Sequence, residues 1–381
     1  MATEQKFIGF NKTYFTGQET NYILEAVAKR KISGNGYFTL KCQEFFEKKY
    51  GFRKCLLTTS CTDALEMAAI LLDVQSGDEI IIPSYTFVST ANAFVLRGAK
   101  IIFIDSSAQH PNMDAEAIEK LITPKTKAIV PVHYAGMACD MEKIMTLANK
   151  HNLFVVEDAA QSIDSYFKDK PLGGIGHLAA FSFHETKNII SGEGGMLVIN
   201  DQRFEKRAEI IWEKGTNRSA FFKGEVDKYG WVDIGSSFLP SDIIAAFLFA
   251  QLENLSDIQK KRIHIWERYN NGLKNLEKNK KAKLPTIPDY ATNNAHMFYL
   301  DCLHEATKDR LMMHLKEKGI NAVFHYLSLH KSPFYSDKHD GRQLPWSDHY
   351  STCLVRLPFY YELSADDQDY IIQSINDFYH S

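Results

Sequence analysis

Short apolar runs recur between residues 50 and 200 and are separated by longer stretches of mixed polarity. The runs are EIIIP (79–83), KIIFID (100–105), AIVPVHY (128–134), LFVVED (153–158), LAAFSF (178–183) and MLVIN (196–200). Amphipathic stretches of helical length lie between several of them, as at 61–73 and 141–152. Apolar strands that alternate with helices are typical of a parallel sheet covered on both faces. The pattern predicts an α/β fold with a large, mostly parallel sheet.

The pattern changes in the last third of the chain. A helical pattern runs from 242 to 276, and its charge rises near Asp257. A proline-punctuated stretch (279–294) follows, and the remainder mixes short strands with helices. We therefore expect a large domain over 1–256 and a smaller C-terminal α+β domain over 257–381. In open α/β sheets, ligands bind beyond the carboxyl ends of the strands, so the residues that follow each strand are the candidates for chemistry.

Composition narrows the class of protein. The 381 residues are 45% hydrophobic and carry a net charge of -3, which favours neither nucleic acid nor an acidic membrane as a partner. The six cysteines are scattered without a CxxC pair, as in a reducing compartment. No secretory signal pattern is evident, and no apolar run approaches the roughly 18 residues of a membrane span. We expect a cytoplasmic protein.

The stretch FSFHETKN (181–188) places a lysine just beyond a predicted strand. Lys187 could form a Schiff base with an aldehyde, or move protons if its surroundings lower its pKa. Ser182, five residues earlier, has a hydroxyl that could bind a phosphate. A single lysine after a strand is more commonly a surface residue, so the interpretation depends on the other strand ends.

Three other strand ends carry candidate groups. Asp158 ends a strand that should be buried, where a carboxylate needs a cation or a strong donor, although it could instead cap a helix in water. The triplet SCT (60–62) opens a helix whose first N–H groups suit a phosphate, or its serine simply caps that helix. Tyr85 and Phe87 could stack on a flat ring or pack in the core.

Together these features describe one ligand, pyridoxal 5'-phosphate (PLP). PLP requires a phosphate-binding site, an acid that keeps the pyridine nitrogen protonated, a lysine that binds the aldehyde and an aromatic side chain that stacks on the ring. A metal site built from His133, Cys139 and His184 is an alternative, but these spacings match no structural zinc pattern. We therefore predict PLP and no metal.

The motif series also resembles a known family. SCTDALEMAA (60–69), PSYTFVSTANA (83–93), VVEDAAQ (155–161), FSFHETKN (181–188) and GEGGMLV (192–198) are similar, in this order, to motifs of the DegT/DnrJ/EryC1/StrS sugar aminotransferases. The resemblance implies the fold-type I fold of PLP-dependent transferases. It also implies a homodimer whose subunits share the active sites.

Roles for individual residues follow from the resemblance. Lys187 matches the lysine that holds the cofactor, and Asp158 matches the acid on the pyridine nitrogen. The other implied cofactor contacts are Gln161 near the cofactor's hydroxyl, Cys61, Thr62 and Ser182 at the phosphate, and Phe87 on the ring. His184 and His325 are candidates for substrate contact, with a purely structural role as the alternative for each.

One motif departs from the family pattern. Many members carry an asparagine, within a GYNYRMSD-like stretch, that reaches the PLP phosphate of the partner subunit. Here the stretch reads GSSFLPSD (235–242), with Ser237 at that position and Leu239 where an arginine is usual. We expect PLP to bind through a phosphate contact that differs from the usual one.

Further stretches indicate a substrate by resemblance. PVHYAGMACDM (131–141), NNAHMFYL (293–300) and AVFHYLSLH (322–330) resemble the branch that moves the amino group of L-glutamate to C4 of dTDP-4-dehydro-6-deoxy-D-glucose. Its product, dTDP-4-amino-4,6-dideoxy-D-galactose, supplies enterobacterial common antigen. The alternatives are another nucleotide ketosugar, with a gluco product or C3 amination, and a non-catalytic relative. The dehydratase branch has histidine in place of the lysine, so Lys187 argues against it.

Overall fold

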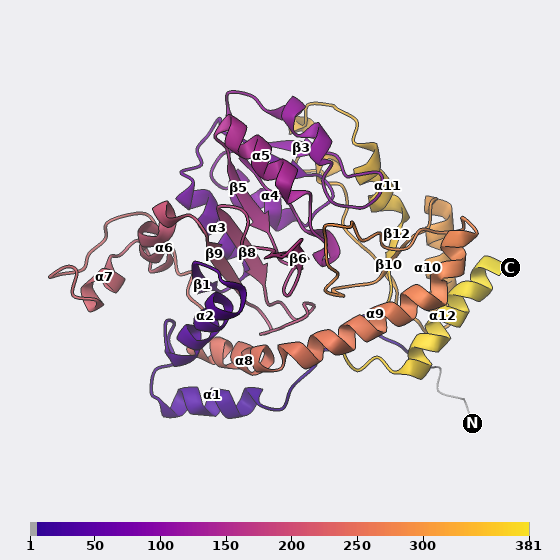
Figure 1. The fold of residues 1–381 in the computed structure, drawn as a ribbon, viewed down its shortest axis with the longest axis horizontal. Coiled ribbons are helices and arrows are strands. Elements are labelled where there is room, and N and C mark those ends of the chain that lie inside the picture. Colours follow the sequence, from indigo (N-terminus) through magenta and orange to yellow (C-terminus); the bar gives the residue numbers. More distant parts are fainter. Residues whose placement is uncertain (1–5, 381) are drawn as a thin grey trace.

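The computed structural model describes residues 6–380 and is built around a seven-stranded sheet (Figure 1). In spatial order the strands are β1 (Lys54–Thr58), β9 (Gly195–Ile199), β8 (Leu178–Ser182), β5 (Phe154–Asp158), β4 (Thr126–Ile129), β2 (Glu79–Pro83) and β3 (Lys100–Ile104). Strand β9 is antiparallel to both of its neighbours, and the other pairs are parallel. The predicted α/β class with a mostly parallel sheet is confirmed.

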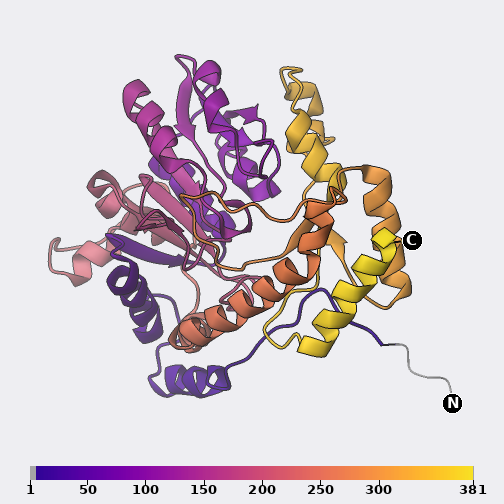
Figure 2. The same cartoon turned by 45° about the vertical axis from the view of Figure 1, so that its right-hand side comes forward.

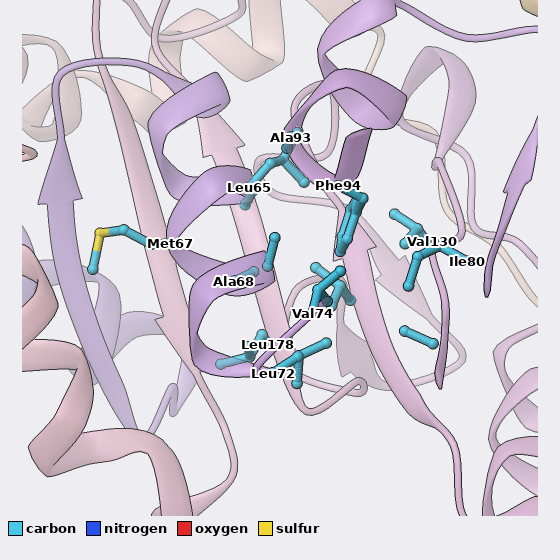
Figure 3. Packing of buried hydrophobic residues seen from close by; sticks show 14 of the residues in the cluster. Leu65, Met67, Ala68, Leu72, Val74, Ile80, Ala93, Phe94, Val130 and Leu178 are labelled. Atoms are coloured by element: carbon cyan, nitrogen blue, oxygen red, sulfur yellow. The ribbon is translucent and has the colours of Figure 1, made fainter. Parts of the chain in front are cut away.

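Helices cover both faces of this sheet. Successive side chains of a strand point to opposite faces, so an apolar strand presents apolar side chains on both faces. Ile80 of β2 packs in the cluster with α3 (Cys61–Leu71), α4 (Val88–Val95) and α6 (Glu205–Trp212), whereas Ile81 packs in the cluster with α5 (Met141–His151). Figure 3 shows the first cluster, with Leu65 and Ala68 of α3 beside Phe94 of α4. The other face also carries α1 (Glu19–Ala28), α2 (Tyr37–Tyr50) and α8 (Asp242–Glu253).

The helical pattern predicted over 242–276 is two helices in the structure. Helix α8 ends at Glu253, and α9 (Leu255–Lys278) begins after one intervening residue and runs across to the second body of the molecule (Figure 2). Asn254 between them has φ -99° and ψ 6°, which interrupts the regular helix. The break lies close to the predicted boundary between 256 and 257, which stays a prediction.

The second body has its own sheet and core. Its strands β10 (Tyr299–Asp301), β12 (Leu354–Arg356) and β11 (Val323–Phe324) form an antiparallel sheet with β12 in the middle. Helices α10 (Glu305–Glu317), α11 (Pro345–Cys353) and α12 (Ala365–His380) accompany it. Ile8, near the start of the described chain, packs into this core and bridges to Ile320.

Two smaller features complete the fold. A hairpin of β6 (Tyr166–Phe167) and β7 (Lys170–Pro171) follows β5, and a segment with α7 (Arg218–Phe222) extends away from the large body (Figure 1). Within residues 6–380, no helix is both long enough and apolar enough to cross a lipid bilayer.

Candidate active site

A cavity of about 1040 Å³ lies between the carboxyl ends of the parallel strands and the second body. Its walls include Cys61, Thr62, Phe87, Asp158, Gln161, Ser182, His184, Lys187 and His325. The structure therefore brings together nearly all of the site residues predicted from the sequence. Tyr85 is buried in an aromatic cluster, so it packs in the core and does not line the cavity, and Ser237 is the second exception. It is exposed, outside this wall, and its backbone forms an isolated bridge to Glu213.

Lys187 follows β8 in a turn and reaches the cavity with a free amine. Its backbone N–H donates to the His184 carbonyl at 2.9 Å, which fixes the turn. Within the described part of the chain, the Lys187 amine forms no hydrogen bond or ion pair. Burial, together with the positive charge of Arg356, lowers the pKa of Lys187 to about 8. A larger fraction of this amine than of an ordinary lysine is therefore neutral, and so nucleophilic, near neutral pH.

Asp158, the last residue of β5, is a buried acid at the floor of the same cavity. Its Oδ2 accepts from the Thr90 hydroxyl at 2.6 Å, and its Oδ1 accepts from the Ala160 N–H at 3.2 Å. Burial raises the pKa of Asp158, whereas these donors and the charge of Lys187 oppose that rise. A carboxylate in this position is stabilised by a cationic ligand. The protonated ring nitrogen of PLP is such a cation.

His133 and Cys139 lie behind Asp158 in a structural network. The Nε2 of His133 donates to the buried Glu157 carboxylate at 3.0 Å, and its Nδ1 accepts from the Cys139 N–H at 3.1 Å. Glu157 also accepts from N–H groups of the 173–176 turn. Both imidazole nitrogens of His133 are therefore engaged. Among residues 6–380, no three His, Cys, Asp or Glu side chains are grouped so that they could hold a metal ion.

The first turn of α3 forms a cradle at one end of the cavity. Ser60 is the N-cap, and its hydroxyl accepts from the Asp63 N–H at 3.1 Å. The N–H groups of Cys61 and Thr62 belong to the first turn, which has no intrahelical acceptors. Gly195 makes room for this turn, because a Cβ there would lie 2.4 Å from the Cys61 nitrogen. Its cross-strand partner is Ser182, so a hydroxyl and free N–H groups converge where a phosphate fits.

Aromatic side chains form the opposite walls. Phe87 lines the cavity and remains 55% exposed, so part of its side chain is open to a ligand. The Gln161 Oε1 accepts from the Ala135 N–H at 2.7 Å, and its Nε2 donates to the Tyr326 hydroxyl at 2.9 Å. Gln161 thereby connects the loop after β5 to the loop after β11.

The two histidines proposed for substrate contact both line the cavity but differ in setting. The ring of His325 stacks on Tyr326 with centroids 3.6 Å apart, and its Nδ1 lies 2.7 Å from the Tyr134 hydroxyl. Burial holds the pKa of His325 well below its usual value, so the ring is neutral. His184 is more open, and its Nδ1 contacts the Thr186 hydroxyl at 3.0 Å.

Sequence reasoning missed several residues of the cavity wall. Arg356 ends β12, and His296 precedes β10 and contacts the Asn188 carboxamide through its Nδ1 at 2.9 Å. Thr90, which donates to Asp158, is a third. For Arg356, the sequence does offer a signal, because this residue is a charged position inside the apolar run LVRLPFY (354–360).

Comparison with known proteins gives consistent matches over nearly the whole chain. The DegT/DnrJ/EryC1/StrS aminotransferase family matches residues 15–376. The GDP-perosamine synthase of Escherichia coli O157:H7 is 32% identical over 98% of this chain and 99% of its own. The spore coat polysaccharide biosynthesis protein SpsC of Bacillus subtilis is 31% identical, over 87% and 88%. The structure of the aminotransferase TlmJ from Streptoalloteichus hindustanus superposes with a TM-score of 0.90 at 26% identity, covering 98% and 99%.

Proposed function

The chain belongs to the DegT/DnrJ/EryC1/StrS aminotransferase family, and from that premise we propose that it transfers the amino group of L-glutamate to a nucleotide ketosugar. Membership confirms the resemblance found in the sequence and, with it, PLP as the cofactor. The observation that carries the proposal is the pairing of Lys187, an unpartnered amine of lowered pKa, with the buried acid Asp158 in one cavity.

The residues of the cavity fit PLP as a set. Bound there, PLP supplies an electron sink for the carbon that carries the amine. Lys187 would hold the aldehyde carbon through its Nζ and afterwards carry a proton to or from the reacting carbon. Asp158 would keep a proton on the ring nitrogen, and the first turn of α3 with Ser182 would bind the phosphate. Phe87 would orient the ring.

For the acceptor we propose dTDP-4-dehydro-6-deoxy-D-glucose, and for the product dTDP-4-amino-4,6-dideoxy-D-galactose. The resemblance of three sequence stretches to that branch supports this choice, and a relative named for synthesis of GDP-perosamine supports a nucleotide sugar in general. The outer cavity wall carries Lys331, Ser332, Ser351 and Thr352. These polar groups suit the phosphates and hydroxyls of such a substrate.

Two expectations about the whole protein belong to the same proposal. We propose a homodimer in which Ser237 of one subunit approaches the cofactor phosphate of the other. The exposed position of Ser237, outside its own cavity wall, is compatible with that arrangement. We also propose a cytoplasmic location, on the basis of the scattered free cysteines.

The test is proton NMR of the sugar that forms when the protein is incubated with PLP, L-glutamate and dTDP-4-dehydro-6-deoxy-D-glucose. A small H3–H4 coupling, meaning an axial amine, is the expected result. A large coupling would move the product to the gluco series, and an unreacted sugar beside a loaded cofactor would contradict the proposed acceptor. Lys187→Ala serves as the inactive control.

A further inference from the structure

The carboxylate of Glu193 lies in the wall of the same cavity as Lys187. Within the described residues 6–380 it accepts no hydrogen bond, and its one ionic contact is with His184, whose Nε2 lies 3.8 Å from the Glu193 Oε1. The Glu193 side chain is 69% exposed. Both carboxylate oxygens are therefore open to a ligand that enters the cavity.

Backbone hydrogen bonds hold Glu193 across a tight turn from His184. In the two bonds that close the turn, the earlier residue donates its N–H, and the pairs are Phe183 with Gly194 at 2.8 Å and Glu185 with Gly192 at 2.9 Å. Gly192 has a φ of 81°, in the left-handed region that favours glycine, and it turns the chain just before Glu193. Lys187 lies within this turn, so one local structure positions both the reacting amine and the carboxylate.

Hydrogen bonding also decides which nitrogen of the neutral His184 ring carries the proton. The His184 Nδ1 accepts from the Thr186 N–H at 3.3 Å, so the ring proton is on Nε2, the nitrogen nearer to Glu193. The pair therefore offers a ligand one N–H donor and two carboxylate oxygens. Uncharged hydroxyl groups, which both donate and accept, suit this set of groups.

We propose that Glu193, with His184 beside it, binds the hydroxyls at C2 and C3 of the acceptor sugar. This inference rests on the proposed function, in which C4 of a ketosugar approaches the cofactor beside Lys187. The C3 hydroxyl is on the carbon next to C4, and the C2 hydroxyl is on the carbon after it. One carboxylate can accept from two neighbouring hydroxyls at once, with one oxygen for each.

The other parts of the substrates match Glu193 less well. A carboxylate repels the two carboxylates of L-glutamate and the diphosphate of the nucleotide sugar, and Lys331 on the outer wall suits that diphosphate instead. The one cationic group, the amine of the donor, has to reach the cofactor carbon at Lys187. The 2'-deoxyribose of a dTDP-sugar has no pair of neighbouring hydroxyls. The acceptor ring is therefore the partner whose chemistry fits.

Binding of an unreactive acceptor analogue tests this contact without relying on turnover. dTDP-6-deoxy-D-galactose keeps the C2 and C3 hydroxyls but has a hydroxyl in place of the ketone at C4, so it cannot accept the amine. Isothermal titration calorimetry gives its Kd, and the Kd of dTDP alone, for the protein whose cofactor carries the amine. We expect Glu193→Gln to raise the Kd of the analogue about tenfold, because the amide loses the charge that strengthens the contact. The Kd of dTDP should not change.

The same contact can be removed from the ligand instead of the protein. The 3-deoxy form of the analogue lacks the C3 hydroxyl, and we expect the wild type to bind it about tenfold more weakly than the analogue itself. In Glu193→Gln the same deletion should cost about threefold or less, because the charged partner of that hydroxyl is already gone.

Two controls make the result specific. Glu185 belongs to the same turn but lies outside the cavity wall, so Glu185→Gln should bind the analogue and dTDP like the wild type. The rate at which L-glutamate loads the cofactor should be the same in Glu193→Gln as in the wild type, which separates a contact with the acceptor from a contact with the donor.

An unchanged Kd of the analogue in Glu193→Gln would overturn the role of Glu193, and so would an equal loss of dTDP binding or slower loading by L-glutamate. If this variant does not take up the cofactor, the wild type decides, and equal Kd values for the analogue and its 3-deoxy form overturn the role. Failure of the wild type to bind the analogue at all would instead contradict the proposed acceptor.

Discussion

At the scale of single residues, burial acts on the ionisable groups of the cavity in opposite directions. It lowers the pKa of Lys187 and of Arg356, and it raises the pKa of Asp158. In each case the charged form loses its water. An amine becomes a better nucleophile and an acid gains affinity for a cationic ring, which are the two properties that PLP chemistry uses.

Asp158→Asn tests the role of the acid. An uncharged amide cannot stabilise the protonated ring nitrogen, so we expect PLP to bind while kcat falls on the order of 100-fold or more. Steady-state assays at cofactor saturation, verified by absorbance, measure this. Thr90→Ser keeps the hydroxyl that donates to Asp158 and is the matched control, with activity near that of the wild type. A turnover of Asp158→Asn equal to that of the wild type would refute the role.

The lowered pKa of Lys187 predicts how PLP uptake depends on pH. Only the neutral amine attacks an aldehyde, so the rate at which the apoprotein captures PLP should rise through about pH 8 and then level off. Arg356→Met removes a charge that lowers this pKa, so its midpoint should move to higher pH. Stopped-flow absorbance gives both profiles. A rise that begins only near pH 10, as for an ordinary lysine, would contradict the account.

At the scale of elements, the phosphate cradle depends on how closely α3 approaches β9. Gly195→Ala places a Cβ 2.3 Å from the Ser60 carbonyl carbon, so the first turn of α3 must move. We expect PLP affinity to fall at least tenfold, as measured by equilibrium dialysis. Gly9→Ala, where the nearest atom would be at 3.7 Å, is the matched control and should bind PLP normally. Normal PLP affinity in Gly195→Ala would show that the cradle does not bind the phosphate.

The elements also show what the sequence could and could not predict. Strand β2 occupies the predicted residues, and the start of α3 was predicted at Cys61, because apolar runs and a capping serine are local signals. The break at Asn254 was missed because the apolar periodicity continues through it. Arg356 was missed because its place in the cavity arises from pairing within the small sheet, which brings together residues distant in the chain.

At the scale of the whole molecule, the second body closes over strand ends that the sheet alone would leave open. Gln161 donates to Tyr326 across this junction, and Asn294 donates to the Gln161 carbonyl at 2.7 Å. The position of the small sheet therefore determines where His325 and Arg356 lie relative to Lys187. Substitutions that loosen the junction should weaken donor and sugar binding together.

The proposed dimer can be tested through the exposed segment 216–236. Trp231 is 83% exposed and Phe222 69%, a concentration of apolar surface that is unusual for a free surface. Analytical ultracentrifugation should find two chains per particle, and Trp231→Glu should shift the particle toward one chain. Met313→Glu, at an exposed apolar residue of α10, is the control and should leave the particle unchanged. A wild-type monomer would contradict the dimer.

Borohydride reduction can show whether Lys187 holds PLP in this cavity. Reduction makes the bond between cofactor and lysine permanent, and mass spectrometry of the digested protein then locates it. We expect the phosphopyridoxyl group on Lys187, and no such group in Lys187→Ala. A group found on another lysine, or on none although PLP is bound, would show that Lys187 does not hold the cofactor.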